Sequence, residues 1–354
     1  MTDLLNLTLP ELESWLASLG EPRFRAAQLF QWIWQKGAAD FAAMTNLSKA
    51  LRDTLAQFAA IAWPQVADTQ VSSDGTVKFL LRLADGALVE TVLIPEEDHL
   101  TQCLSSQVGC PMACAFCSTG AGGFSRNMAA GEMAAQVLVA RHYLKDQGRD
   151  PAGLRNLVFM GMGEPLLNLP ELLRALTIMT HDSGLGFSTR RVTVSTCGLP
   201  GPLRELGMSG LASLAVSLHA PTQELRERLM PKAAAAADLD TLMAALRAYP
   251  LTPRQRITIE YVLLAGVNDA PEHARQLVRL LAGVKCKVNL IAYNPAPDSP
   301  FAAPTQEGIL AFEKILWDKG MTAVLRKSKG SDISAACGQL RAAHLDTTDA
   351  KSQE

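Results

Sequence analysis

The 354-residue chain has no excess of positive charge, because its 33 Lys and Arg residues face 35 Asp and Glu residues and leave a formal net charge of -2. Proteins whose main partner is a nucleic acid often carry a strong basic excess, so any such contact here must rest on local patches. The chain also lacks an apolar run of the ~18 residues that a membrane-spanning helix needs. Its acidic first residues lack the basic start and apolar stretch of a secretory signal. We therefore predict a cytoplasmic protein with no membrane contact.

The cysteine content argues against a disulfide framework. Seven cysteines are an odd number, and four of them are crowded into residues 103–117. This usage fits a reducing compartment and a metal-binding or catalytic role better than paired disulfides. Hydrophobic residues make up 48% of the chain and charged residues 19%, as in an ordinary folded protein. The length allows one large α/β domain with a small accessory one.

Residues 1–95 are expected to form the accessory domain, which would contact RNA if RNA is the partner. Its first helix begins with a capping box formed by Thr8 and Glu11 and stops at Gly20. Two further helices are predicted at 22–36 and 48–58 from the spacing of their apolar residues. The runs at 76–83 and 87–94 flank Asp85-Gly86, which is a strong signal for a β-hairpin.

Beyond residue 95, strands and helices alternate, which predicts an α/β core over residues 96–340. The strand-like runs are at 103–108, 157–161, 191–195, 213–218, 257–264 and 287–293, and the helical stretches include 130–147, 169–181, 271–282 and 305–319. Six βα repeats imply a parallel sheet that is curled into a barrel or part of one. A doubly wound open sheet is the alternative. Residues 341–354 are predicted to be a polar tail.

Cys110, Cys114 and Cys117 form a C-x₃-C-x₂-C pattern, the most specific chemical signal in the chain. Thiolates select iron–sulfur clusters, zinc or copper(I), and three of them converge most easily from a loop that wraps around the bound group. A structural zinc site would need a further Cys or His. Cys103 is a candidate, although its predicted strand would aim it away from the loop. With three ligands, a four-iron cluster would keep one iron open.

Several other segments share one family pattern with this motif. They are Cys103-Leu-Ser-Ser-Gln-Val-Gly-Cys110, Phe116-Cys117-Ser118-Thr119, Gly161-Met162-Gly163-Glu164-Pro165, Ser217-Leu218-His219, Glu260-Tyr-Val-Leu-Leu-Ala-Gly-Val-Asn268-Asp269, Lys287-Val-Asn-Leu-Ile291, Tyr293-Asn294-Pro295 and Ala336-Cys337-Gly338-Gln339-Leu340. Together they resemble the RlmN/Cfr family of radical-SAM RNA adenine methyltransferases over nearly the whole chain. The resemblance implies a partial (β/α)6 barrel. It also implies a 4Fe-4S cluster on Cys110, Cys114 and Cys117, whose open iron binds S-adenosylmethionine (SAM).

The resemblance further implies methylation of carbon 2 of adenine, at adenine 2503 in the peptidyl-transferase region of 23S ribosomal RNA and at adenine 37 of certain transfer RNAs. Cys337 matches the cysteine that carries the methyl group as S-methylcysteine, and Cys103 matches the thiol that releases the product through a disulfide. Glu90 matches the proton acceptor. Independently of the family, Glu90 is the only charge in the apolar run 87–94, where a carboxylate is costly unless it is paired or functional. The alternative is an edge-strand Glu that faces water.

Seven residues match the SAM site of the family. Most of them follow the ends of predicted strands, and the carboxyl ends of barrel strands share one mouth. They are Gly163, Glu164, Ser195, Ser217, Leu218, His219 and Asn294. For His219 taken alone, a buried core histidine is the simpler interpretation.

Arg190-Arg191 and the run 326–329 are the visible basic spots, and the second precedes the Cys337 loop, where it would steer phosphates. The expected partners are 23S ribosomal RNA, transfer RNA and an electron donor such as a flavodoxin or ferredoxin, and we expect a monomer. Two other functions stay open. One is the carbon-8 methylation of the Cfr relatives, which share these motifs, and the other is a zinc-stabilised RNA-binding module without catalysis.

Overall fold

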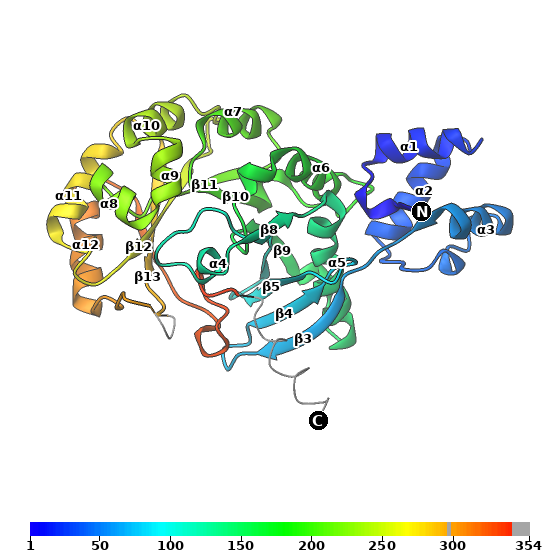
Figure 1. Ribbon diagram of the computed structural model, residues 1–354, viewed down its shortest axis with the longest axis horizontal. Coiled ribbons are helices and arrows are strands. Elements are labelled where there is room, and N and C mark those ends of the chain that lie inside the picture. The colour runs from blue at the N-terminus through cyan, green and yellow to red at the C-terminus, as the bar shows by residue number, and fades with distance from the viewer. Residues whose placement is uncertain (296–298, 342–354) are drawn as a thin grey trace.

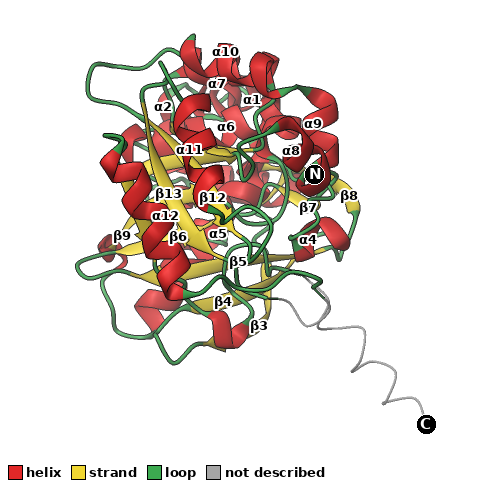
Figure 2. Cartoon of the chain, turned by 90° about the vertical axis from the view of Figure 1, so that its left-hand side faces the viewer, coloured by secondary structure: helices red, strands yellow, loops and turns green. Residues whose placement is uncertain are grey.

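The computed structural model describes residues 1–295 and 299–341. One ten-stranded sheet organises the chain, in the order β14-β13-β12-β11-β10-β9-β6-β5-β4-β3. From β6 to β14, every pair of neighbouring strands is parallel, whereas β3, β4 and β5 continue the sheet in antiparallel fashion. Helices lie along the outside of the curved sheet (Figures 1 and 2).

The parallel strands follow one another in space as they do in sequence. They are β6 (Leu100–Cys103), β9 (Leu154–Phe159), β10 (Val192–Thr196), β11 (Ser213–Ser217), β12 (Ile257–Leu263), β13 (Cys286–Ala292) and β14 (Ala323–Arg326). A doubly wound sheet reverses its strand order at a switch point, and this order has no reversal. The prediction of a partial barrel in an α/β fold is therefore confirmed, and the open-sheet alternative is wrong.

The helices that cover these strands are short and mostly amphipathic. They are α5 (Ala130–Asp146), α6 (Leu169–Thr180), α7 (Pro200–Ser209), α8 (Gln223–Leu229), α9 (Pro231–Ala236), α10 (Leu239–Arg247), α11 (Pro271–Leu280) and α12 (Gln306–Asp318). Helix α5 is buried along most of its length, because it packs between the sheet, α6 and the N-terminal segment. Among the described residues, no helix combines the length and apolarity that crossing a bilayer requires.

The first core strand lies earlier than predicted. The run 103–108 contains no breaker, but β6 ends at Cys103 and the chain then leaves the large sheet. Residues Gln107–Gly109 form β7, which pairs with β8 (Phe124–Asn127) in a separate two-stranded sheet around the cysteine loop. The strand β14 was not predicted at all, because its four residues run directly into the basic segment 326–329.

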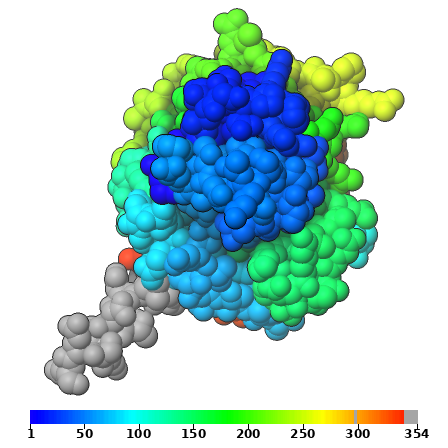
Figure 3. Space-filling view, turned by 90° about the vertical axis from the view of Figure 1, so that its right-hand side faces the viewer, coloured from blue at the N-terminus to red at the C-terminus, as the bar shows by residue number. Residues whose placement is uncertain are grey.

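The N-terminal helices form a lobe at one end of the molecule, where they cover the adjoining face (Figures 1 and 3). They are α1 (Leu9–Ser18), α2 (Phe24–Trp34) and α3 (Lys49–Phe58), and the predicted capping box of Thr8 and Glu11 is present. The hairpin strands β4 (Val77–Arg82) and β5 (Leu88–Pro95), with β3 (Gln65–Val71), belong instead to the large sheet, since β5 pairs with β6. The sheet is thus continuous across residue 95, and the domain boundary there stays a prediction. Of the predicted tail 341–354, all but Arg341 lies outside the described residues.

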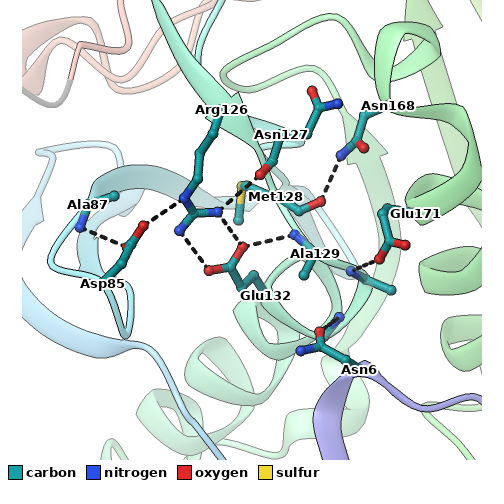
Figure 4. A network of polar contacts seen from close by, with 12 residues as sticks. Asn6, Asp85, Ala87, Arg126, Asn127, Met128, Ala129, Glu132, Asn168 and Glu171 are labelled. Atoms are coloured by element: carbon teal, nitrogen blue, oxygen red, sulfur yellow. Dashed lines mark hydrogen bonds and ion pairs between the residues drawn. The ribbon is translucent and has the colours of Figure 1, made fainter. Parts of the chain in front are cut away.

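A polar network ties the lobe and the hairpin to the core (Figure 4). Arg126 on β8 forms a bidentate pair with Glu132 on α5 and also binds Asp85 of the hairpin turn, at distances of 2.7–2.9 Å. Asn6, just before α1, accepts a hydrogen bond at 3.0 Å from the backbone N–H of Gly131 on α5. Bidentate, charge-assisted pairs are the stronger class of such contacts.

Replacing Gly131 with alanine should loosen this junction. A Cβ atom at position 131 would lie 2.5 Å from the backbone carbon of Leu5, so the N-terminal segment would have to move. Overpacking of this kind costs about 1–3 kcal/mol. The measurement is the midpoint of urea unfolding, together with the rate of proteolysis in residues 1–61. The matched control is Gly201→Ala at the equivalent second position of α7, where a Cβ atom meets nothing within 4 Å. Equal stability of the two variants would contradict the prediction.

Candidate active site

One cavity opens at the carboxyl ends of the barrel strands and collects most of the predicted site residues. Its wall includes all three motif cysteines together with Gly163, Glu164, Ser195, Ser217, His219, Asn294 and Cys337. These residues come from the cysteine loop, from the segments that end β9 to β13 and from the C-terminal loop. The structure therefore brings these residues to one barrel mouth, and their roles stay predictions.

A glycine at position 109 allows the two chain segments at the base of the cysteine loop to approach closely. Gly109 has a φ of +77°, and a Cβ atom there would lie 2.1 Å from the carbonyl oxygen of Gly123. The neighbouring backbone N–H of Cys110 donates to that same oxygen at 2.7 Å. A side chain at position 109 would therefore force apart the two strands of the small β7–β8 sheet, from which the loop with Cys114 and Cys117 projects.

Two thiols of this loop, Cys110 and Cys114, are placed where ionisation is unfavourable without a cation. Burial raises the pKa of Cys110 to about 11, and the nearby Cys117 and Glu164 act in the same direction. Burial likewise raises the pKa of Cys114, as do the thiols of Cys117 and Cys110. Iron bound to these sulfurs would supply the missing positive charge, since a coordinating thiol is deprotonated. The donor set thus fits an iron–sulfur cluster.

The described residues offer no site for a single metal ion. Within residues 1–295 and 299–341, no three His, Cys, Asp or Glu side chains lie close enough together to hold one metal ion. A four-iron cluster does not require this, because its cysteines bind different irons.

Glu164 follows β9 and is almost fully buried. One of its carboxylate oxygens accepts the backbone N–H of Cys197 at 2.8 Å, and the other accepts that of Leu166 at 3.0 Å. Burial raises its pKa, and the hydrogen bonds act against this rise. The carboxylate is therefore oriented rigidly, with acceptor capacity left over for a ligand amine. Gly163 beside it has a φ of +106°, which a residue with a side chain rarely adopts.

His219 is a neutral, fixed residue of the wall. Its Nδ1 accepts the backbone N–H of Val262 at 3.0 Å, and its ring packs edge-on against Phe116. Burial, aided by the charge of Arg226, lowers its pKa to about 3. It therefore does not act as an acid or base near neutral pH. Leu218 is fully buried and does not line the cavity, and its backbone N–H donates to the carbonyl of Glu260.

The two cysteines predicted to be redox partners differ in their exposure to solvent. Cys337 is exposed on the C-terminal loop, whereas Cys103 is 7% exposed at the end of β6 and does not line the cavity. Burial raises the pKa of Cys103 to about 12, and the charge of Cys337 adds to this rise. The loop that carries Cys337 is held in place by Thr119, whose hydroxyl donates to the carbonyl of Leu340 at 2.6 Å.

Glu90 lies in the interior of the sheet rather than at an edge, because β5 is flanked by β4 and β6. It is 1% exposed, and it too does not line the cavity. Its Oε1 is 3.2 Å from the Nζ of Lys78, and its Oε2 accepts the backbone N–H of Arg341 at 2.7 Å. The carboxylate therefore joins a buried lysine on β4 to the segment just after Cys337.

Three charged residues near the site were missed by sequence reasoning. Lys78 looked like an ordinary strand lysine, and Arg326 looked like part of a surface basic run, although it lines the cavity. All four residues of that run line a second, adjoining cavity, which also includes Cys337 and Glu96. The third residue is Glu260, also in the cavity wall. The sequence contained a signal for Glu260, because this residue is the one charged side chain in an apolar strand, as Glu90 is.

Comparison with known proteins gives concordant results. Residues 2–61 match the family described as Ribosomal RNA large subunit methyltransferase N-terminal domain, and residues 104–278 match the Radical SAM superfamily. The chain is 62% identical over 98% of its length to the Dual-specificity RNA methyltransferase RlmN of Nitratidesulfovibrio vulgaris, of which it covers 95%. It is 50% identical over 96% of its length to the protein of that name from Geobacter sulfurreducens, of which it covers 92%. A radical SAM methyltransferase from Sphaerobacter thermophilus, 45% identical, superimposes with a TM-score of 0.91 over 97% of this chain and 100% of that one.

Proposed function

The chain belongs to the RlmN family of dual-specificity RNA methyltransferases, and we propose that it methylates carbon 2 of adenine in 23S ribosomal RNA and in transfer RNA. It is a SAM-dependent RNA methyltransferase with a radical-SAM core and the 4Fe-4S cluster that this family carries. The specific positions that we propose are adenine 2503 of the ribosomal RNA and adenine 37 of the transfer RNAs. The observation that best supports this function is the convergence of the three motif cysteines, Glu164 and Cys337 on one cavity.

Carbon 2 of adenine has no nucleophilic lone pair, so direct polar methyl transfer to it is not feasible. When bound, the cluster and SAM supply radical chemistry that can act on an unactivated carbon–hydrogen bond. For this chain we assign Cys110, Cys114 and Cys117 to the cluster. We assign the SAM site to a group of residues around them, namely Gly163, Glu164, Ser195, Ser217, Leu218, His219 and Asn294.

Three further residues are assigned to the reaction itself. The Cys337 thiolate takes the methyl group of one SAM by displacement, with S-adenosylhomocysteine as the leaving group, and holds it as S-methylcysteine, so that the group to be transferred sits on the protein. Glu90 accepts the proton that leaves the adenine ring, for which it must exchange one of its present partners for the substrate. Cys103 then forms a disulfide with Cys337 as the bond from the Cys337 sulfur to the transferred carbon breaks, which frees the methylated RNA. The two electrons that the thiols lose would be taken up by a second SAM, which is cleaved to methionine and 5′-deoxyadenosine. The exposure of Cys337 and the effect of its charge on the pKa of Cys103 support this division of roles.

The partners follow from the same assignment. RNA phosphates would contact the second cavity, where Lys327 and Lys329 lie beside the Cys337 loop. A one-electron donor such as a flavodoxin or ferredoxin would reduce the cluster, and we expect the enzyme to act as a monomer. We place it in the cytoplasm because its RNA substrates are there.

The test uses SAM with a trideuterated methyl group, the anaerobically reconstituted enzyme, a reductant, and bacterial ribosomal and transfer RNA. The RNA is digested and its nucleosides are analysed by mass spectrometry. We expect 2-methyladenosine that retains only two of the three deuterium atoms, because one is lost while the methyl group is on Cys337. Retention of all three would rule out the proposed route, and 8-methyladenosine would assign the chain to the Cfr-type reaction. A colourless protein that holds zinc and methylates nothing would favour a binding module instead.

A further inference from the structure

Beneath the mouth of the barrel, neighbouring strands place polar side chains at one level. The register pairs Ser217 of β11 with Glu260 of β12, and Glu260 with Asn289 of β13. On β10, which is the other neighbour of β11, the hydroxyl of Ser195 lies 3.4 Å from that of Ser217. Barrel interiors are normally filled by apolar, branched side chains, so a polar row at this level needs an explanation.

One of the two carboxylate oxygens of Glu260 lacks a partner among the described residues. The residue is 3% exposed and lines the cavity, and its Oε1 accepts the side-chain amide of Asn289 at 3.1 Å. Its Oε2 is buried and has no hydrogen-bond partner among the described residues. A buried acceptor without a donor is costly, and burial raises the pKa of this carboxyl. An oxygen in this state, at the wall of a cofactor cavity, points to a ligand that donates a hydrogen bond.

The cavity wall becomes apolar two residues further along β12 and β13, nearer to the mouth of the barrel. On β12 the next inward residue after Glu260 is Val262, and on β13 the next after Asn289 is Ile291; both line the cavity. The nucleoside of SAM has two kinds of surface, an apolar purine face and a ribose with two hydroxyls. The apolar level of Val262 and Ile291 matches the purine, whereas the polar level below it matches the ribose.

We propose that Glu260 is a further SAM-binding residue, whose Oε2 accepts a hydrogen bond from a ribose hydroxyl of the cofactor. The proposal rests on the proposed function only in that SAM occupies this cavity, and it does not depend on which RNA is methylated. The same oxygen has a second conceivable donor in SAM, the exocyclic amine of the adenine, and the experiment separates the two.

The experiment measures equilibrium binding by calorimetry on the anaerobically reconstituted holoenzyme. The ligands are S-adenosylhomocysteine, which cannot methylate Cys337, its 2′-deoxy and 3′-deoxy analogues, and the inosine analogue that lacks the amine. The variant is Glu260→Gln. Because Asn289 donates to Oε1, the carbonyl of the glutamine should stay on that side and its NH₂ should replace the free acceptor. The control is Glu313→Gln, another buried acid, which accepts the backbone N–H of Leu325 outside the cavity. Iron content and visible absorbance confirm that each variant keeps its cluster.

We expect one of the deoxy analogues to bind wild-type enzyme about ten- to a hundredfold more weakly than S-adenosylhomocysteine, as for a hydrogen bond to a charged group. Glu260→Gln should bind S-adenosylhomocysteine more weakly than the wild type by a similar factor. It should also bind S-adenosylhomocysteine and that deoxy analogue with equal affinity, while Glu313→Gln should bind every ligand like the wild type. The proposal is overturned if wild-type enzyme binds both deoxy analogues as tightly as the parent ligand, a result that needs no variant. It is also overturned if the variant keeps the full preference, or if only the inosine analogue loses affinity. If the proposed RNA substrate or methylated carbon were wrong, the affinities for these ligands would be the same, so the two proposals can fail separately.

Discussion

Replacing Cys337 with alanine should reduce RNA methylation by at least about a thousandfold, as expected when a covalent nucleophile is removed. The cavity around the loop should survive, because the backbone contacts that hold it do not involve the thiol. Among them, the N–H of Ser118 donates to the carbonyl of Gly338 at 2.7 Å. Without the thiol, no methyl group can be held on the chain, although the cluster and the SAM site stay intact.

The measurement has two readouts on the same reconstituted enzyme. Mass spectrometry of the protein after incubation with SAM should show one added methyl group on the wild type and none on Cys337→Ala. Iron content should be equal in both. The control is Cys286→Ala, since Cys286 on β13 is half-buried and does not line the cavity. Methylated RNA from Cys337→Ala at a rate near that of the wild type would refute the role assigned to this thiol.

Replacing Lys78 with methionine should lower the free energy of unfolding by about 3–5 kcal/mol, the usual cost of removing one partner from a buried ion pair. The side chains of Lys78 and Glu90 are 4% and 1% exposed, and Nζ and Oε1 are 3.2 Å apart. Among the described residues, the variant would leave the buried Glu90 carboxylate with the backbone N–H of Arg341 as its one remaining partner. The loss of the ion pair should therefore destabilise both the sheet and the C-terminal segment that carries Cys337.

Urea unfolding of the variants, compared at the same protein concentration and without cluster, measures this effect. The double variant Lys78→Met/Glu90→Gln should recover most of the loss, because the neutral amide still has an oxygen to accept the Arg341 N–H. The surface control is Lys314→Met. Lys314 pairs with Asp318 on α12, where both side chains are more than half exposed, and the change should stay within about 0.5 kcal/mol. If Lys78→Met is as stable as the wild type, the buried ion pair does not contribute to stability. If the double variant is no more stable than Lys78→Met, the unpaired charge of Glu90 is not the cause of the loss.

Local sequence patterns determined the class of the fold and the chemistry. The C-x₃-C-x₂-C spacing, the alternation of strand and helix periods, and the lone acid at Glu90 are all properties of short stretches of chain, so they could be read without knowing what packs against what. The same patterns failed where the outcome depended on distant segments. The run 103–108 has the composition of one strand, but its first residue ends β6 and its last residues pair with β8 instead.

Only the tertiary structure decided which groups meet. Continuity of the sheet through β5 and β6 put Glu90 in the interior, and the pairing of β4 with β5 set Lys78 close enough to Glu90 to form a buried ion pair. The register of β11, β12 and β13 aligned Ser217, Glu260 and Asn289. These contacts join residues far apart in the chain, and they depend on strand register and on how far the sheet curls, which no short stretch of sequence encodes. The sequence could therefore supply the candidates, while the partners of each charge were fixed by long-range packing.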